Sequence, residues 1–307
     1  MQSPQLQFLP VQGPVARDGG PRRVAFWDWP AQPGADARRV VICVHGLSRQ
    51  GRDFDVLAQA LTPCARVLAV DVAGRGHSDW LADPSGYQVP TYAADLAQLI
   101  AWVRACTPDA VIDWVGTSMG GLIGMAIAAQ PALTLRRLVL NDVGPVIEWA
   151  SLVRIGSYVG RNPSFDSEQA AVDYLASISV GFGPHTPAQW MALSRPMLRE
   201  REGRWWLHYD PAIATPFKAL SDAVDEAASR QAVSAGEAAL WGLYDAIRSP
   251  TLLLRGADSD LLKRETALQM GQRGPRARCV EFAGVGHAPT LVSDDQVVVV
   301  RDFLWAE

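Results

Sequence analysis

Ser118 has the surroundings that point most directly to chemistry. Residues 116–120 read Gly-Thr-Ser-Met-Gly, which fits the pattern G-x-S-x-G. An apolar β-branched run precedes this stretch and a helix-forming run follows it, so the serine is predicted to lie on a sharp strand-to-helix turn. Small flanking residues leave room for such a turn, which lifts the hydroxyl group clear of the sheet. Ser118 is therefore the predicted nucleophile, and a serine that caps the helix is the alternative interpretation.

His287 is the predicted base, because a serine hydroxyl group is a poor nucleophile until a neighbouring base takes its proton. It alone among the histidines follows the last predicted strand, in a loop of small residues that ends at Pro289. Imidazole accepts a proton and returns it to a leaving group near neutral pH. A plain surface histidine is the alternative. The other histidines stand at positions 45, 77, 185 and 208.

Four short motifs, each directly after a predicted strand, carry a resemblance to a known family. They are Val-His-Gly-Leu at 44–47, Asp-Val-Ala-Gly-Arg-Gly-His-Ser-Asp at 71–79, the serine motif at 116–120 and Gly-Val-Gly-His at 284–287. In this order they resemble the α/β-hydrolase fold family over nearly the whole chain. The resemblance implies a mostly parallel eight-stranded sheet flanked by helices, with a helical cap insertion. It also implies an oxyanion hole formed by the N–H groups of Leu47 and Met119, with His45 bracing the Leu47 loop.

The acid that orients the histidine has two candidates, Asp142 and Asp260. In the family this acid usually follows the seventh strand as G-x-x-D, but Ser259 occupies that slot here, with Asp258 and Asp260 on either side. A one-residue bulge would bring Asp260 into place. Asp142 instead follows the sixth predicted strand, as in the cofactor-free dioxygenases and amide hydrolases that take their acid there. We favour Asp142 because the seventh-strand slot departs from the pattern; Asp258 is a more distant candidate.

Strand-like runs alternate with amphipathic stretches, which favours a mostly parallel sheet with crossover helices. The predicted strands are 6–11, 24–29, 40–44, 67–72, 111–115, 138–141, 251–254 and 278–282, and the predicted helices are 54–61, 92–104, 122–129 and 294–305. The alternation stops between positions 145 and 240. We therefore expect a core domain formed by residues 1–144 and 241–307, with residues 145–240 as a helical cap over the carboxyl ends of the strands. Aromatic and sulfur-containing cap residues are expected to line an apolar pocket or to pack the cap onto the sheet, namely Phe182, Met191, Met197, Trp205 and Trp206.

The composition is that of an ordinary globular protein, with 307 residues, 49% apolar and 20% charged. A net charge of −4 gives no reason to expect nucleic acid or an anionic membrane as a partner, and no run reaches the length of a membrane span. Cys43 and Cys279 lie in strand-like runs, so we expect buried free thiols and a cytoplasmic protein. No pair of histidines has metal-ligand spacing, and we expect neither a metal nor a cofactor.

Together these residues predict a serine carboxylesterase that acts on an ester of a small, largely apolar acid. A serine at position 118 argues against the dehalogenase and epoxide-hydrolase branches, whose nucleophile is aspartate. The alternatives on the same fold are a carbon–carbon bond hydrolase, a cofactor-free dioxygenase and a ligand-sensing protein without turnover. The partner is expected to be a small-molecule substrate, whose identity the sequence leaves open together with the oligomeric state.

Overall fold

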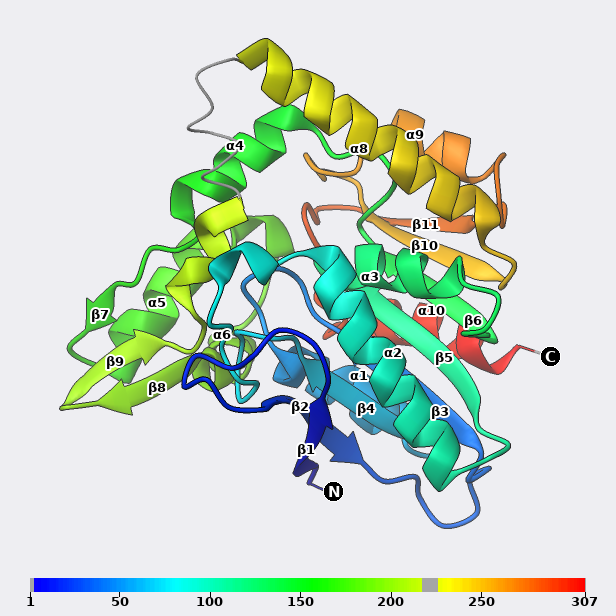
Figure 1. Ribbon diagram of the computed structural model, residues 1–307, viewed down its shortest axis with the longest axis horizontal. Helices are drawn as coiled ribbons and strands as arrows, with labels where there is room; N and C mark the ends of the chain where they lie inside the picture. The colour runs from blue at the N-terminus through cyan, green and yellow to red at the C-terminus, as the bar shows by residue number, and fades with distance from the viewer. Residues whose placement is uncertain (1–2, 217–225, 307) are drawn as a thin grey trace.

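A single eight-stranded sheet forms the centre of the protein, as seen in the computed structural model, which describes residues 3–216 and 226–306 (Figure 1). β1 and β2 pair antiparallel at one edge, and all the other strands run parallel. This arrangement confirms the predicted fold class. In spatial order the strands are β1 (Gln5–Val11), β2 (Arg22–Trp29), β4 (Arg66–Asp71), β3 (Arg39–Val44), β5 (Val111–Thr117), β6 (Arg137–Asn141), β10 (Thr251–Gly256) and β11 (Arg278–Phe282).

Helices cover both faces of the sheet, and each face has its own hydrophobic core. One face is covered by α1 (Asp55–Leu61) and α10 (Asp294–Trp305). The other is covered by α2 (Val89–Cys106), α3 (Met119–Ala128), α8 (Glu226–Ala246) and α9 (Arg264–Met270). Because its neighbours shield it on both sides, β3 is apolar throughout its buried part, and Val41, Ile42 and Cys43 are each 0% exposed. The site elements therefore stand on a sheet that is buried between two hydrophobic cores.

The last helix shows position in the fold overriding local propensity. Val297–Val300 is a run of β-branched residues that favours a strand in isolation. It nevertheless lies within α10, as predicted from its place after the final strand. Val297, Val300 and Leu304 are buried at helical spacing against the sheet, whereas Val298 is exposed. Burial of one helical face therefore decides this element.

The segment between β6 and β10 contains a small sheet as well as helices (Figure 1). Its helices include α4 (Trp149–Tyr158), α5 (Glu168–Ile178) and α6 (Pro187–Ser194). The sheet is antiparallel, in the order β7 (Ser164–Phe165), β9 (Arg204–Leu207) and β8 (Leu198–Arg201). The sequence predicted helices alone here, because two- to four-residue strands are too short to show a period-two pattern. We call residues 145–240 the cap.

Several shorter features complete the fold. Single turns of 3₁₀ helix join the main elements: η1 (Gly51–Phe54), η2 (Pro84–Gly86), η3 (Val180–Phe182), η4 (Arg195–Met197) and η5 (Pro211–Ala214). All four cysteines are free; Cys43 is buried as expected, but the expectation was wrong for Cys279, which is exposed on the edge strand β11.

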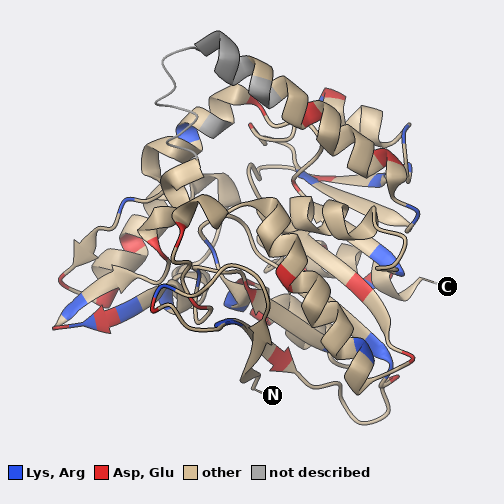
Figure 2. Cartoon of the chain, viewed as in Figure 1, with Lys and Arg blue, Asp and Glu red and all other residues tan. Residues whose placement is uncertain are grey.

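Acidic and basic residues are interspersed along the described chain rather than collected in one block (Figure 2). Many of the arginines form ion pairs with aspartate, as in Arg66–Asp28 of the core and Arg154–Asp260 between cap and core. In the parts of the chain that the structure covers, no helix has the length and apolar character needed to cross a membrane.

Candidate active site

Ser118 lies at the junction of β5 and α3, where the backbone adopts φ 51° and ψ −115°. A non-glycine residue with positive φ is strained and persists only where its surroundings hold it in place. The flanking glycines explain how the turn fits: a Cβ at Gly116 would collide with the backbone of Gly120, and a Cβ at Gly120 would collide with the carbonyl of Val44. The predicted sharp turn is present, and no side-chain cap is made by the serine.

His287 faces the serine. Its Nε2 lies 3.0 Å from Oγ of Ser118, within hydrogen-bond distance. The loop that carries it follows β11 and is held from the cap, because the N–H of Gly286 donates to the carbonyl of Gly181 at 2.7 Å. His185 of the cap also contacts this loop, with its Nε2 2.8 Å from Oγ1 of Thr290. Core and cap therefore both position the imidazole.

Asp142 is the carboxylate that lies against the histidine, with Oδ2 2.6 Å from Nδ1 of His287. Its side chain is fully buried at the end of β6. Two further groups donate to it: the N–H of Gly256 to Oδ1 at 2.9 Å, and the hydroxyl of Ser259 to Oδ2 at 2.6 Å. An Nδ1–H that donates to this carboxylate leaves Nε2 as an acceptor for the serine proton, which is the tautomer a base requires.

Asp260, the other candidate acid, lies elsewhere. Its carboxylate forms an ion pair with Arg154 of α4, at 2.7 and 3.0 Å, and its side chain is 49% exposed. The proposed one-residue bulge is absent, because Ser259 keeps the slot after β10 and bonds to Asp142. The sequence favoured Asp142 and kept Asp260 as the alternative, and of these two the structure brings Asp142 to His287.

Two backbone N–H groups near the serine are the predicted oxyanion donors. Met119 is the first residue of α3, so its N–H has no acceptor within the helix. Leu47 lies in the loop after β3 and lines the same cavity as Ser118; among the described residues, no backbone carbonyl accepts its N–H. Both groups are suited to hydrogen-bond a developing oxyanion.

Two buried side chains fix the Leu47 loop. His45 donates from Nδ1 to the carbonyl of Gly46 at 2.6 Å and accepts from the N–H of Val72 at 3.0 Å, so it is neutral. Burial lowers the pKa of His45 to about 3, which agrees with that role. Arg75 is 0% exposed and donates from Nε to the carbonyl of Leu47 at 2.8 Å, while its Nη2 lies 3.7 Å from Sδ of Met119. Arg75 was not assigned a role from the sequence, since a motif of glycines around an arginine gives no sign that its side chain turns inward.

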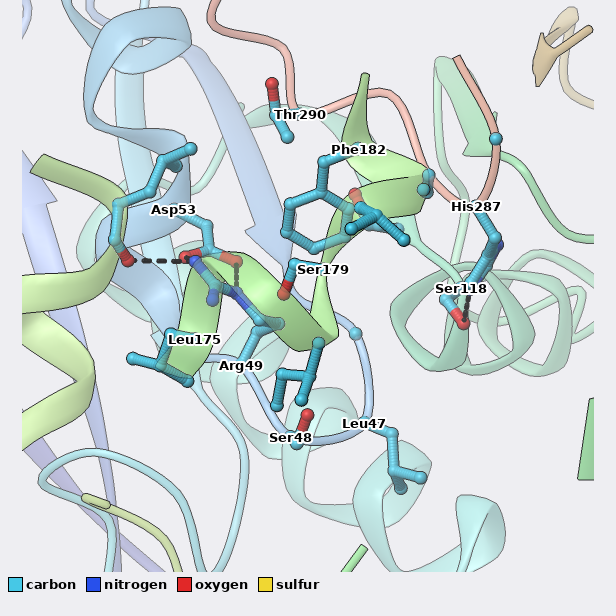
Figure 3. Close-up of a pocket in the computed structure, with 18 of the residues that line it drawn as sticks. Leu47, Ser48, Arg49, Asp53, Ser118, Leu175, Ser179, Phe182, His287 and Thr290 are labelled. Atoms are coloured by element: carbon cyan, nitrogen blue, oxygen red, sulfur yellow. Dashed lines mark hydrogen bonds and ion pairs between the residues drawn. The ribbon is translucent and has the colours of Figure 1, made fainter. Parts of the chain in front are cut away.

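A cavity of about 360 Å³ lies over Ser118 between core and cap (Figure 3). Phe182 and Met197 line it as expected, whereas Met191, Trp205 and Trp206 are not among its lining residues. Both tryptophans lie on β9, and Trp205 packs against the hydrophobic core instead. Arg49 and Asp53 also line the cavity, a charged pair that sequence patterns did not reveal.

This arrangement can transfer an acyl group. A nucleophilic hydroxyl, a base held in the required tautomer by a buried acid, and two oxyanion donors are the components that acyl transfer to serine uses. Among the residues described, no three histidine, cysteine, aspartate or glutamate side chains come together as a metal site.

Comparisons with known proteins agree with the fold and with ester hydrolysis. Residues 39–294 match the family model described as alpha/beta hydrolase fold. A 3-hydroxybutyrate-oligomer hydrolase of Cupriavidus necator is 44% identical over 307 residues, covering 98% of both chains. An esterase of Mycobacterium tuberculosis is 28% identical, over 88% of this chain and 84% of its own. Among solved structures, an alpha/beta hydrolase from Novosphingobium aromaticivorans aligns with a TM-score of 0.80 at 32% identity, covering 99% of both chains.

Proposed function

We propose that this chain, which belongs to the α/β-hydrolase fold family and is an ester hydrolase, acts on one class of substrate. The proposed substrates are short oligomeric esters of 3-hydroxybutyrate. The observation that carries the choice of substrate is the 44% identity with a 3-hydroxybutyrate-oligomer hydrolase, which extends over 98% of both chains. The cavity supports the choice, because about 360 Å³ is near the lower end of the range for ligand sites and suits a short chain.

The proposed reaction has two halves. Oγ of Ser118 attacks the ester carbonyl carbon while Nε2 of His287 takes the hydroxyl proton, and the resulting oxyanion is held by the N–H groups of Leu47 and Met119. As the carbonyl re-forms, the ester C–O bond breaks and the leaving alkoxide takes the proton from His287. The product of this half is a hydroxy acid with a free 3-hydroxyl group and an acyl group bound to Ser118.

Water completes the cycle. It attacks the acyl carbon as His287 accepts one of its protons, and collapse of the second oxyanion returns that proton to Oγ of Ser118. Asp142 stabilises the imidazolium that forms in each half from its 2.6 Å contact with Nδ1. His287 returns to its neutral form in each half and Ser118 is freed at the end of the second, so the net reaction is one ester plus one water giving one acid and one alcohol.

The test is product release from defined oligomers. Purified protein is incubated with the dimer and the trimer of 3-hydroxybutyrate, and the free monomer is measured by chromatography, with Ser118→Ala as the control for contaminating esterases. We expect monomer from both substrates with the native protein and none with the variant. A protein that cleaves p-nitrophenyl butanoate but releases no monomer from either oligomer would be an esterase with another substrate.

The cytoplasm is the compartment that we propose. Free cysteines, two of them exposed, support it because exposed thiols persist in a reducing environment.

A further inference from the structure

Arg49 is a buried arginine in the wall of the catalytic cavity. It stands two residues after Leu47, and its side chain is 10% exposed. Asp53 holds one edge of the guanidinium group, with Nε and Nη2 donating to its two oxygens at 2.7 and 2.6 Å. Nη2 also donates to the carbonyl of Leu193 in the cap at 2.9 Å. The group is thus fixed from both core and cap, as a planar fork that loses little entropy when it binds a further acceptor.

The other edge of this fork has free donors. Nη1 carries two N–H groups, and within residues 3–216 and 226–306 no acceptor takes either of them. Figure 3 shows Arg49 beside Asp53 in the pocket that also contains Ser118 and His287. Gly46 links the two regions, because a Cβ built on it would lie 3.6 Å from Cβ of Ser118 and 4.0 Å from Cγ of Arg49.

The charge of the cavity decides which acceptor suits this edge. Three aspartates line the cavity against two arginines, namely Asp53, Asp258 and Asp260 against Arg49 and Arg154. Asp53 already neutralises Arg49, so an anion brought to Nη1 would meet a cavity of net negative charge. An uncharged carbonyl oxygen satisfies the free N–H groups without that repulsion. The ring of Phe182, 5.5 Å from the guanidinium carbon, and the side chain of Leu175 help to keep this region apolar.

We propose that Nη1 of Arg49 binds the carbonyl oxygen of a second, uncharged ester group of the substrate, so that the enzyme selects oligoesters over simple monoesters. This inference rests on the proposed function, because it names what distinguishes an oligomer of three or more units, which has a second ester group, from a monoester in the cavity. A site built to hydrogen-bond a substrate group rejects analogues that lack the group, since its own buried donors are then left unpaired. Arg49 is therefore a specificity residue, distinct from the serine, histidine and aspartate.

The test compares kcat/KM for two uncharged substrates. One is the methyl ester of the O-acetylated 3-hydroxybutyrate dimer, whose central ester has a carbonyl on either side; the other is 2-pentyl butanoate, which has a single ester. We expect the native protein to favour the first by roughly 10²-fold or more, which lies below the discrimination of about 10⁴–10⁵-fold that sites built to hydrogen-bond one substrate group can reach. Arg49→Lys keeps a charge opposite Asp53 but offers no second planar edge, and it is expected to reduce this ratio at least tenfold.

Two further variants make the result specific. Arg49→Gln with Asp53→Asn removes the pair without leaving a buried charge, and it is expected to reduce the ratio in the same way. Arg52→Lys changes an arginine of the adjoining turn η1 that is paired with Asp55 and does not line the cavity, and is expected to keep the native ratio. Circular dichroism and thermal unfolding verify that each variant is folded.

Three outcomes would overturn the inference. The first is a native protein with no preference for the oligoester. The second is an Arg49→Lys variant that loses activity on both substrates equally, which would make Arg49 a support of the Leu47 loop. The third is a preference for the free dimer acid over its methyl ester that Arg49→Lys abolishes, which would make the acceptor a carboxylate. Failure of the proposed function is seen separately, as absence of monomer release from the free oligomers, and the ratio can be measured even then.

Discussion

The hydroxyl group of Ser259 donates a 2.6 Å hydrogen bond to Oδ2 of Asp142, the same carboxylate oxygen that lies 2.6 Å from Nδ1 of His287. Ser259 also accepts the N–H groups of Leu261 and Leu262, at 3.3 and 3.1 Å, so its orientation is fixed. The residue after the seventh core strand, where the family usually places its acid, thus supports an acid supplied by the neighbouring strand β6.

This relationship predicts that the catalytic carboxylate can be transferred from position 142 to position 259. Asp142→Ser is expected to lose about 10⁴-fold in kcat, because the imidazole loses the partner that fixes its tautomer. Adding Ser259→Asp to that variant is expected to restore at least tenfold of the loss, since the new carboxylate extends from the slot that already contacts this site. Steady-state kinetics on p-nitrophenyl butanoate measure both. If kcat does not recover in a folded double variant, a carboxylate at position 259 does not contact the histidine.

Asp142 and Asp260 are expected to respond very differently to the same substitution. Asp142→Asn leaves the shape of the side chain but donates where His287 also donates, and kcat is expected to fall by about 10⁴-fold. Asp260→Asn removes a surface ion pair with Arg154, worth about 0–1 kcal/mol, and is expected to keep kcat within a factor of about two. The kcat values of the two variants, measured side by side, check this. Equal losses would contradict the assignment.

Ser118→Ala separates ester hydrolysis from the other chemistries of the fold. Removal of the nucleophile is expected to reduce kcat at least about 10³-fold, leaving only what the oxyanion donors and binding supply. Release of 3-hydroxybutyrate from the trimer is the measurement, and His287→Ala is the matched control. A Ser118→Ala protein with substantial turnover, beside an inactive His287→Ala protein, would indicate that the histidine deprotonates the substrate directly.

Arg75 is expected to matter for both stability and rate. Replacing it with methionine removes the donor that holds the carbonyl of Leu47, and kcat is expected to fall by about tenfold to a hundredfold as the oxyanion donors lose their alignment. KM is expected to change much less, because Arg75 is 0% exposed and does not line the cavity. Arg104→Met is the control, since Arg104 also donates to backbone carbonyls but does so far from the serine, at Ala132 and Thr134. A rise in KM with constant kcat would contradict this role.

His45 predicts a pH dependence of stability. Burial lowers its pKa to about 3 from 6.5, so between these values the unfolded chain binds more protons than the folded one. The contribution of neutral His45 to the free energy of unfolding is complete above pH 6.5. It is lost as the pH falls toward 3, by about 1.4 kcal/mol per pH unit. Asp71 acts in the opposite direction, because burial raises its pKa to about 6 from 3.8, so it stabilises the fold as the pH falls.

Comparison with a variant isolates the histidine. His45→Gln leaves Asp71 in place, and its unfolding free energy in urea is expected to fall less steeply than that of the native protein between pH 6.5 and 4.5. Parallel curves for the two proteins would mean that the histidine is not held neutral.

The strand order and the serine turn were predictable because both depend on local patterns. Parallel strands are continuous apolar runs, and residues 116–120 show the turn directly. The catalytic acid was harder to predict, because the sequence favours Asp142 over Asp260 only by the departure at Ser259, and packing decides which carboxylate reaches His287. Neither Arg49 nor Arg75 was predicted to be a functional residue. An arginine in a loop is usually solvated, and their burial depends on partners distant in the chain, such as Leu193 for Arg49.

The bond from the N–H of Gly286 to the carbonyl of Gly181 couples the catalytic histidine to the cap. It attaches the residue before His287 to a cap segment that also lines the cavity. Any displacement of this segment would break the bond and loosen the loop that carries the base. The alignment of His287 with Ser118 therefore depends on a cap segment that lies about a hundred residues away in the sequence.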